Sequence, residues 1–193
     1  ADAVSWLDTN AEPNTSIQYK VYAYKGSNTS ASELSVVIDN TFPAPTNISY
    51  QKLNLSSIKL NWTDNSAGEA GFIIDRKIGV NSWAAYDSTS TDAVTWTDTA
   101  SPINETLQYR VRAYKNNYAS TNIETASIDN SIPAPTNLTA DVNGMSITLN
   151  WTDNSTGEDG FKIDRMTVDS VWVENYTSVG SNIVTWNETV ADT

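Results

Sequence analysis

The chain has 193 residues, a formal net charge of −12 and only 11 basic residues, with 39% hydrophobic and 10% aromatic side chains. The hydrophobic content is enough for a packed core, and the scarcity of positive charge argues against nucleic acid as a partner. The absence of Cys and His excludes disulfides, thiolate nucleophiles, Ser-His-Asp triads and the usual zinc sites. No apolar run approaches the roughly 18 residues of a membrane span, so we predict no membrane insertion.

A repeat of 90 residues runs through the chain. Trp6, Trp96 and Trp186 occur in the segments AVSW, AVTW and IVTW, each 90 residues after the previous one. Other repeated pairs are IQYKVYAYK (17–25) with LQYRVRAYK (107–115), and PAPTN at 43–47 with PAPTN at 133–137. The period is too long for helical solenoid repeats, so we predict that each period is a small domain.

Short strands follow one another within each repeat. Residues 58–63 (IKLNWT) and 147–152 (ITLNWT) alternate apolar and polar side chains, which predicts one buried and one solvated face. Residues 109–113 (YRVRA) alternate in the same way, and the segment GFKID at 160–164 places its Phe and Ile inward. The Asn-Gly pair at 143–144 predicts a two-residue hairpin turn. About seven strands per period, with turn signals between them, predict an all-β chain of tandem β-sandwiches.

The order of these motifs resembles fibronectin type III domains. The motifs are a proline-led start, a Trp on the second strand, Gly-Phe-x-Ile-x-Arg on the third strand and Tyr-x-Val-x-Ala late in the repeat. The segment LNWTDNSTGEDGFKIDR is similar to the corresponding segment of fibronectin type III domains in secreted prokaryotic proteins. The resemblance implies an immunoglobulin-like sandwich that serves as a spacer, adhesion module or accessory domain. It also implies that Trp62 and Trp151 are core anchors, with Tyr19 and Tyr109 at the tyrosine-corner position.

The repeat predicts three parts in the chain. Residues 43–132 hold a complete domain, residues 1–42 the C-terminal part of a preceding repeat, and residues 133–193 the N-terminal part of a following one. A half sandwich exposes its apolar face and unpaired strand edges. Three interpretations stay open: a window cut from a longer array, end segments without partners, or completion of 133–193 by residues 1–42 of a neighbouring chain. The last would build a head-to-tail fibre, and the Pro-rich joints between repeats predict a semi-rigid rod.

An acidic segment follows the second strand of each repeat. Asp153, Asn154, Ser155, Glu158 and Asp159 offer oxygen ligands for a hard cation, but the spacing fits no EF-hand loop. The earlier copy has Ala70 in place of Asp159. We therefore favour a structural turn, in which Asp64 and Asp153 bind turn amides and Glu69 and Glu158 pair with Arg76 and Arg165. No metal ligand, cofactor site or catalytic residue is predicted, and we expect that the chain is not an enzyme.

The tryptophans invite comparison with carbohydrate-binding surfaces. Trp96 shares the apolar face of its strand with Val94, which predicts core packing for it as for Trp62 and Trp151. Trp83 and Trp172 follow turns and are candidates for an exposed edge that contacts a glycan or a cell-surface protein.

The chain contains eleven Asn-x-Ser/Thr sequons where about five are expected by chance. They begin at Asn14, Asn28, Asn47, Asn54, Asn61, Asn104, Asn137, Asn150, Asn154, Asn175 and Asn187. Two interpretations stay open: a merely polar surface, or N-glycosylation of an exported protein. Because most bacteria lack general N-glycosylation, the second favours a cell-surface glycoprotein of archaea.

Together these features predict an extracellular or cell-surface structural protein, a rod, sheath or filament component whose main partner is another copy or a neighbouring repeat. The alternatives are a non-catalytic spacer or accessory region of a secreted glycan-active enzyme, and an adhesin.

Overall fold

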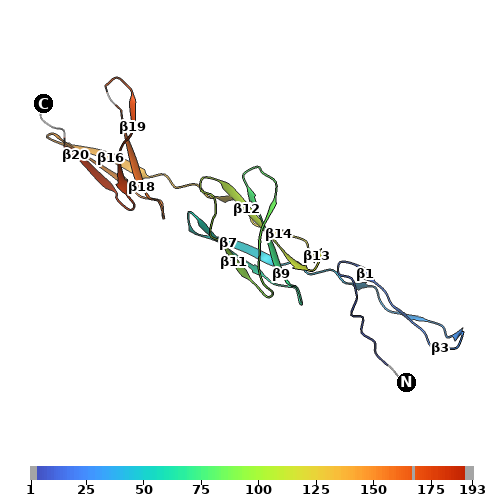
Figure 1. Ribbon diagram of the computed structural model, residues 1–193. Coiled ribbons are helices and arrows are strands. Elements are labelled where there is room, and N and C mark those ends of the chain that lie inside the picture. Colours follow the sequence, from blue (N-terminus) through green and yellow to red (C-terminus); the bar gives the residue numbers. More distant parts are fainter. Residues whose placement is uncertain (1–3, 167, 190–193) are drawn as a thin grey trace. The chain divides into compact units, whose positions relative to one another are not determined.

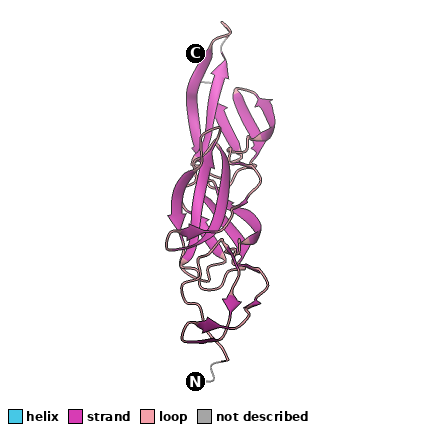
Figure 2. Cartoon of the chain, turned by 90° about the vertical axis from the view of Figure 1, so that its right-hand side faces the viewer, coloured by secondary structure: helices cyan, strands magenta, loops and turns pink. Residues whose placement is uncertain are grey.

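The computed structural model describes residues 4–166 and 168–189, and every regular element in them is a β-strand (Figure 2). This confirms the predicted all-β class. The few remaining residues of the predicted end parts 1–42 and 133–193, namely 1–3, 167 and 190–193, lie outside the described residues. No helix among the described residues is long and apolar enough to cross a membrane.

The chain divides into two compact units. Unit 1 holds residues 1–50, 60–96 and 107–128, and unit 2 holds residues 51–59, 97–106 and 129–193. Strands that continue from one unit into the other are described with unit 1.

The N-terminal part of unit 1 is a ladder of two-residue strands, which we name the N-terminal hairpin (residues 16–39). The pairs are β1 (Ser16–Ile17) with β6 (Ile38–Asp39), β2 (Lys20–Val21) with β5 (Glu33–Leu34), and β3 (Tyr24–Lys25) with β4 (Asn28–Thr29). All three pairs are antiparallel, as expected for a segment that folds back on itself. Between them, Tyr19 and Ser35 exchange hydrogen bonds: the Tyr19 N–H donates to Ser35 Oγ at 3.0 Å, and the Ser35 N–H donates to Tyr19 O at 2.9 Å.

Strands β7 to β15 form two sheets whose strands alternate along the chain. The first has the order β11-β8-β7, from β7 (Thr46–Asn54), β8 (Ser57–Thr63) and β11 (Thr95–Asp98). The second begins β10-β9-β12, from β9 (Gly71–Ile78), β10 (Ala84–Ser88) and β12 (Thr106–Lys115). Its far edge consists of β13 (Tyr118–Ala119), β14 (Ile123–Glu124) and β15 (Ile128–Asp129), which all pair with β12.

The core of unit 1 lies between these two sheets. Trp62 on β8 is 5% exposed, and its ring centroid lies 5.3 Å from that of Phe72 on β9. Leu60, Ile74 and Val111 are fully buried beside them. Alternate residues of both sheets therefore meet face to face, which is the packing of a β-sandwich. Burial of each such side chain stabilises the fold by about 1.5–3 kcal/mol.

Unit 2 contains two further small sheets. One has the order β16-β17-β20, from β16 (Thr136–Asn143), β17 (Ser146–Thr152) and β20 (Thr185–Thr189). The other pairs β18 (Gly160–Met166) with β19 (Trp172–Gly180), as Figure 1 shows. Trp151 and Phe161 meet across the two sheets with ring centroids 5.4 Å apart. Among the described residues, β18 has a paired strand on one edge only.

The hairpin between β16 and β17 differs from the prediction by one residue. Asn143 pairs with Ser146, so the two loop residues are Gly144 and Met145 rather than Asn143 and Gly144. Gly144 has φ 59°, a conformation that glycine adopts without a steric penalty.

Candidate functional site: an open apolar face beside β18

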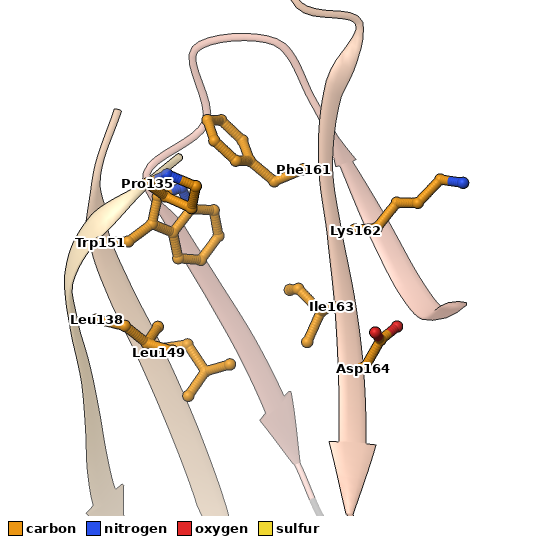
Figure 3. Close-up of a pocket in the computed structure, with 8 residues that line it drawn as sticks. All are labelled: Pro135, Leu138, Leu149, Trp151, Phe161, Lys162, Ile163 and Asp164. Carbon is orange, nitrogen blue, oxygen red and sulfur yellow. The ribbon is translucent and has the colours of Figure 1, made fainter. Parts of the chain in front are cut away.

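The inner face of the unit 2 sheets is hollow and partly open. The hollow encloses about 170 Å³ and is lined by Pro135, Leu138, Leu149, Trp151, Phe161, Lys162, Ile163 and Asp164. Phe161 and Ile163 of β18 point toward Trp151 and Leu149, whereas Lys162 and Asp164 point away from them (Figure 3). This alternation follows from the period of two along a strand.

Unit 1 shows how buried the equivalent residues of the repeat become when a third strand lies beside them. Phe72 and Ile74 lie 89 positions before Phe161 and Ile163, and both are 0% exposed. Phe161 and Ile163 are only half-buried. The difference has a direct cause, because β12 pairs with β9 and places Val111 opposite Ile74. Among the described residues, no strand takes the place beside β18 that β12 takes beside β9, so this apolar face is open.

The N-terminal hairpin carries the complementary residues, and they are exposed. Val21 is 71% exposed, whereas Val111, 90 positions later, is 0% exposed. Ile38 is 42% exposed, and Ile128, 90 positions later, is 1% exposed. The hairpin thus presents apolar side chains that are buried in the second copy of the same sequence.

The structure places the predicted core anchors as follows. Trp62, Trp151 and Tyr109 are 5%, 9% and 0% exposed. Trp96 is half-buried, with its indole Nε1 donating to Asp87 Oδ2 at 2.8 Å. Half-buried aromatic residues with a polar tip commonly keep such a partner.

Tyr19 is also half-buried, and its hydroxyl donates to Asp8 Oδ2 at 2.7 Å. This contact ties the segment between β1 and β2 to an upstream loop, much as a tyrosine corner ties a strand to one. The hydrogen bond lowers the pKa of Asp8, and the same bond raises the pKa of Tyr19.

The predicted turns of the acidic segments are confirmed. Asp64 Oδ1 accepts the Ser66 N–H at 2.8 Å, and Asp153 Oδ1 accepts the Ser155 N–H at 2.8 Å. Asx turns of this kind satisfy backbone amides that would otherwise lack a partner. In unit 2, Asn154 Nδ2 also donates to Ala134 O at 2.8 Å.

The predicted glutamate partners differ from the observed ones. Glu158 Oε1 accepts the Asn182 N–H at 3.1 Å, and Arg165 pairs with Glu188 at 3.0 Å. Glu69 Oε1 accepts the Asp92 N–H at 2.8 Å. Asp92 was not a predicted site residue, since it lies 23 positions after Glu69 and only the fold brings the two together. The equivalence of positions 92 and 182 in the repeat is the sequence signal that could have identified it. Asp159 and Ala70, by contrast, are both exposed.

The remaining surface candidates, the two tryptophans and the sequon asparagines, differ in how exposed they are. Trp83 is half-buried under the guanidinium of Arg110, 4.8 Å from its ring centroid, whereas Trp172 is 58% exposed. Among the sequon asparagines, only Asn61 and Asn150 are half-buried, and the other nine are exposed.

No protein-family model and no curated protein sequence matches the chain. Among solved structures, a two-domain fibronectin type III segment of chicken tenascin is similar at 11% identity and a TM-score of 0.45, covering 76% of this chain and 83% of that one. The chicken interferon gamma receptor alpha chain is similar at 14% identity and a TM-score of 0.43, covering 79% and 84%. The twitchin kinase region of C. elegans is similar at 14% identity and a TM-score of 0.41, covering 47% and 17%.

The described part of the chain shares an all-β sandwich architecture with these fibronectin type III structures, and the likeness concerns the fold alone.

Proposed function

We propose that the chain is a non-catalytic structural module of an extracellular rod, sheath or filament, built from tandem fibronectin type III-like sandwiches that join head to tail. The observation that carries the proposal is the match between the N-terminal hairpin and the open face beside β18. In the proposed contact, the hairpin of one copy supplies the strand that covers β18 of another copy.

The backbone of the hairpin is already arranged for this role. The Tyr109 N–H donates to Thr125 Oγ1 at 3.0 Å, and the Thr125 N–H donates to Tyr109 O at 2.9 Å. These bonds repeat the exchange between Tyr19 and Ser35 with the same lengths. The hairpin therefore already makes this pair of bonds of its buried counterpart, and docking beside β18 would have to join its two-residue strands into a continuous one like β12.

The apolar side chains of hairpin and face are complementary in register. If residues 17–25 pair with β18 as β12 pairs with β9, Val21 lies opposite Ile163, as Val111 lies opposite Ile74. The contact would cover a half-buried Ile163 and an exposed Val21 together. Burial of apolar surface on both partners supplies the driving force.

Charge complementarity supports the same register. In unit 1, Arg110 on β12 lies opposite Asp75 on β9, and its Nε donates to Asp75 Oδ2 at 2.7 Å. The equivalent residues in the proposed contact are Lys20 and Asp164, which are exposed. A Lys-Asp pair therefore takes the place of the Arg-Asp pair.

A second copy as donor gives a heterologous contact. Each copy offers a hairpin and accepts another one on a different surface, so the contact does not close on itself and grows a filament. Semi-rigid joints between repeats suit such a filament.

Sedimentation of the chain across a range of concentrations tests the proposal. We expect concentration-dependent oligomers for the wild type and monomers for Val21→Asp, because the new carboxylate would be buried against Ile163. The matched control is Val36→Asp, since Val36 is 81% exposed and its counterpart Ala126 is exposed too. The reversed pair Lys20→Asp with Asp164→Lys should assemble, whereas either single variant should assemble less. A wild type that stays monomeric at all concentrations contradicts the proposal.

Location outside the cell is part of the same proposal and is supported by the sequons. Nine of the eleven sequon asparagines are exposed, so a glycan at these positions displaces no core side chain. We propose an N-glycosylated surface protein of archaeal type. Intact mass spectrometry of native material tests this, and a mass equal to that of the bare polypeptide contradicts it.

Trp172 supports a second candidate, binding of a glycan or a cell-surface protein. The residue is 58% exposed, and exposed indoles offer a stacking surface. A glycan array with the wild type and Trp172→Ala tests this, with Trp83→Ala as the control. Equal binding by wild type and Trp172→Ala would contradict the assignment.

A further inference from the structure

Three carboxylates converge at one end of the unit 1 sandwich. Asp64 follows β8, Glu69 precedes β9 and Asp92 lies between β10 and β11. Each offers an oxygen, and the three oxygens all lie within 4.8 Å of one another. Like charges this close repel each other, so the cluster needs positive charge nearby.

The buried member of the cluster has an unused oxygen. Glu69 is 5% exposed, and its Oε1 accepts hydrogen bonds from the Asp92 N–H at 2.8 Å and the Thr91 hydroxyl at 3.1 Å. Its Oε2 is buried and has no hydrogen-bond partner. A buried anionic oxygen without a partner is costly unless a cation satisfies it.

We propose that Asp64, Glu69 and Asp92 bind one calcium ion. Calcium takes oxygen ligands at about 2.3–2.6 Å, so two oxygens on one ion lie at most about 4.6–5.2 Å apart. Oxygens that all lie within 4.8 Å of one another can reach one calcium ion together. Magnesium binds at about 2.1 Å and demands near-ideal octahedral geometry, whereas calcium accepts irregular sets of oxygens. Water completes the coordination of calcium in such open sites.

The local charge also fits a divalent ion. The ammonium of Lys115 lies beside Gly68, 3.5 Å from the position that a Cβ would take there. The three carboxylates carry a charge of −3, and one calcium ion offsets most of it. The bound ion would connect the β8–β9 and β10–β11 loops, and each of these loops passes from one sheet to the other.

Unit 2 contains a natural comparison for the site. Its equivalent residues are Asp153, Glu158 and Asn182, so an amide replaces the third carboxylate. The Asn182 N–H donates to Glu158 Oε1 at 3.1 Å, which repeats the Asp92 contact. Asp92 has φ 56° and Asn182 has φ 58°. Asn thus fits the backbone of this loop, and Asp92→Asn replaces a carboxylate ligand by a neutral, weaker amide oxygen without a change of conformation.

Calorimetric titration of the EDTA-treated chain with calcium chloride tests the proposal, together with thermal unfolding in calcium and in EDTA. We expect one ion per chain, with a Kd of about 10⁻⁴–10⁻³ M as in extracellular calcium modules, and a higher melting temperature in calcium. Asp92→Asn should weaken calcium binding at least about tenfold and abolish the increase in melting temperature that calcium gives the wild type. In EDTA, the melting temperature of the variant should stay at or above that of the wild type.

Asn182→Asp provides the converse experiment. It should complete a second calcium site in unit 2, so the variant should bind two calcium ions where the wild type binds one. Three results would overturn the proposal: no binding heat and no melting shift for the wild type, Asp92→Asn binding as tightly as the wild type, or magnesium binding as tightly as calcium. The calcium site does not depend on head-to-tail assembly, because all three ligands come from one copy of the chain. The titration can therefore also be carried out on the Val21→Asp monomer.

Discussion

Arg110 Nε lies 2.7 Å from Asp75 Oδ2, and Arg112 donates to the same carboxylate. The Asp75 side chain is 3% exposed, whereas the side chains of Arg110 and Arg112 are 25% and 22% exposed. One buried anion thus joins β9 to two positions of β12. Loss of that anion leaves two partly desolvated cations on the sheet without their acceptor.

We expect Asp75→Asn to lower the free energy of unfolding by about 2 kcal/mol, less than for a fully buried pair because the arginines keep some solvent contact. Urea unfolding followed by tryptophan fluorescence measures this. Both variants are made in the Val21→Asp monomer, because Asp164 belongs to the proposed head-to-tail contact. The matched control is Asp164→Asn, whose exposed carboxylate accepts the Asn175 N–H at 2.6 Å. A loss for Asp75→Asn no larger than that for Asp164→Asn would show that the network adds no stability.

Asn130 is expected to be a second point of sensitivity. It is 0% exposed, and its Nδ2 donates to Leu55 O at 3.0 Å and to Pro102 O at 2.7 Å. Asn130→Ala leaves two carbonyls in the interior without these donors, so we expect a loss of about 1–3 kcal/mol. Asn40, its half-buried counterpart, donates to Glu12 O at 2.7 Å, and Asn40→Ala should cost less because solvent replaces the bond. Thermal unfolding of the two variants measures the difference, and equal losses would contradict the explanation.

The alternation of apolar residues was enough to predict the strands, but not how far each strand extends. The sequences 17–25 and 107–115 are nearly the same, yet the second lies within a ten-residue strand and the first is broken into two-residue pieces. Strand β12 has partners on both edges, whereas among the described residues the strands of the N-terminal hairpin pair only with one another. Local sequence specifies which face is apolar, and the neighbouring strand decides whether the ladder is continuous.

The candidate site shows the same division between local and distant information. The turns at Asp64 and Asp153 are local hydrogen bonds, and sequence alone predicted them. The proximity of Asp92 to Glu69, and the pairing of Arg165 with Glu188, depend on which loops the sandwich brings together. Contacts between residues more than 20 positions apart follow from topology, which the alternation pattern does not contain.

The ionised state of Glu69 predicts a loss of stability in acid. The Asp92 N–H holds the pKa of Glu69 below its ordinary value of 4.5, against the opposing effect of burial. A carboxyl whose pKa is lowered by folding stabilises the fold fully above its unfolded pKa, and this stability is lost as the pH falls through the folded pKa. We expect the wild type to lose more stability than Glu69→Gln below pH 4.5. Urea unfolding in EDTA at a series of pH values measures this, and identical pH profiles would contradict it.

The start of β9 requires glycine. A Cβ on Gly71 would lie 1.9 Å from Thr89 O, and the residue has φ 149°. Gly71→Ala must therefore separate β9 from residue 89 or distort the backbone, and we expect a loss of about 2–4 kcal/mol.

Gly144→Ala is the control for backbone conformation alone, since Gly144 has φ 59° and nothing lies within 4 Å of its added Cβ. That change should cost about 1–2 kcal/mol. Circular dichroism melts of both variants separate the two effects. Gly71→Ala should melt clearly below Gly144→Ala, because only the former brings a side chain against a neighbouring backbone. If the two variants melt at the same temperature, the close approach at Thr89 is not what requires glycine at position 71.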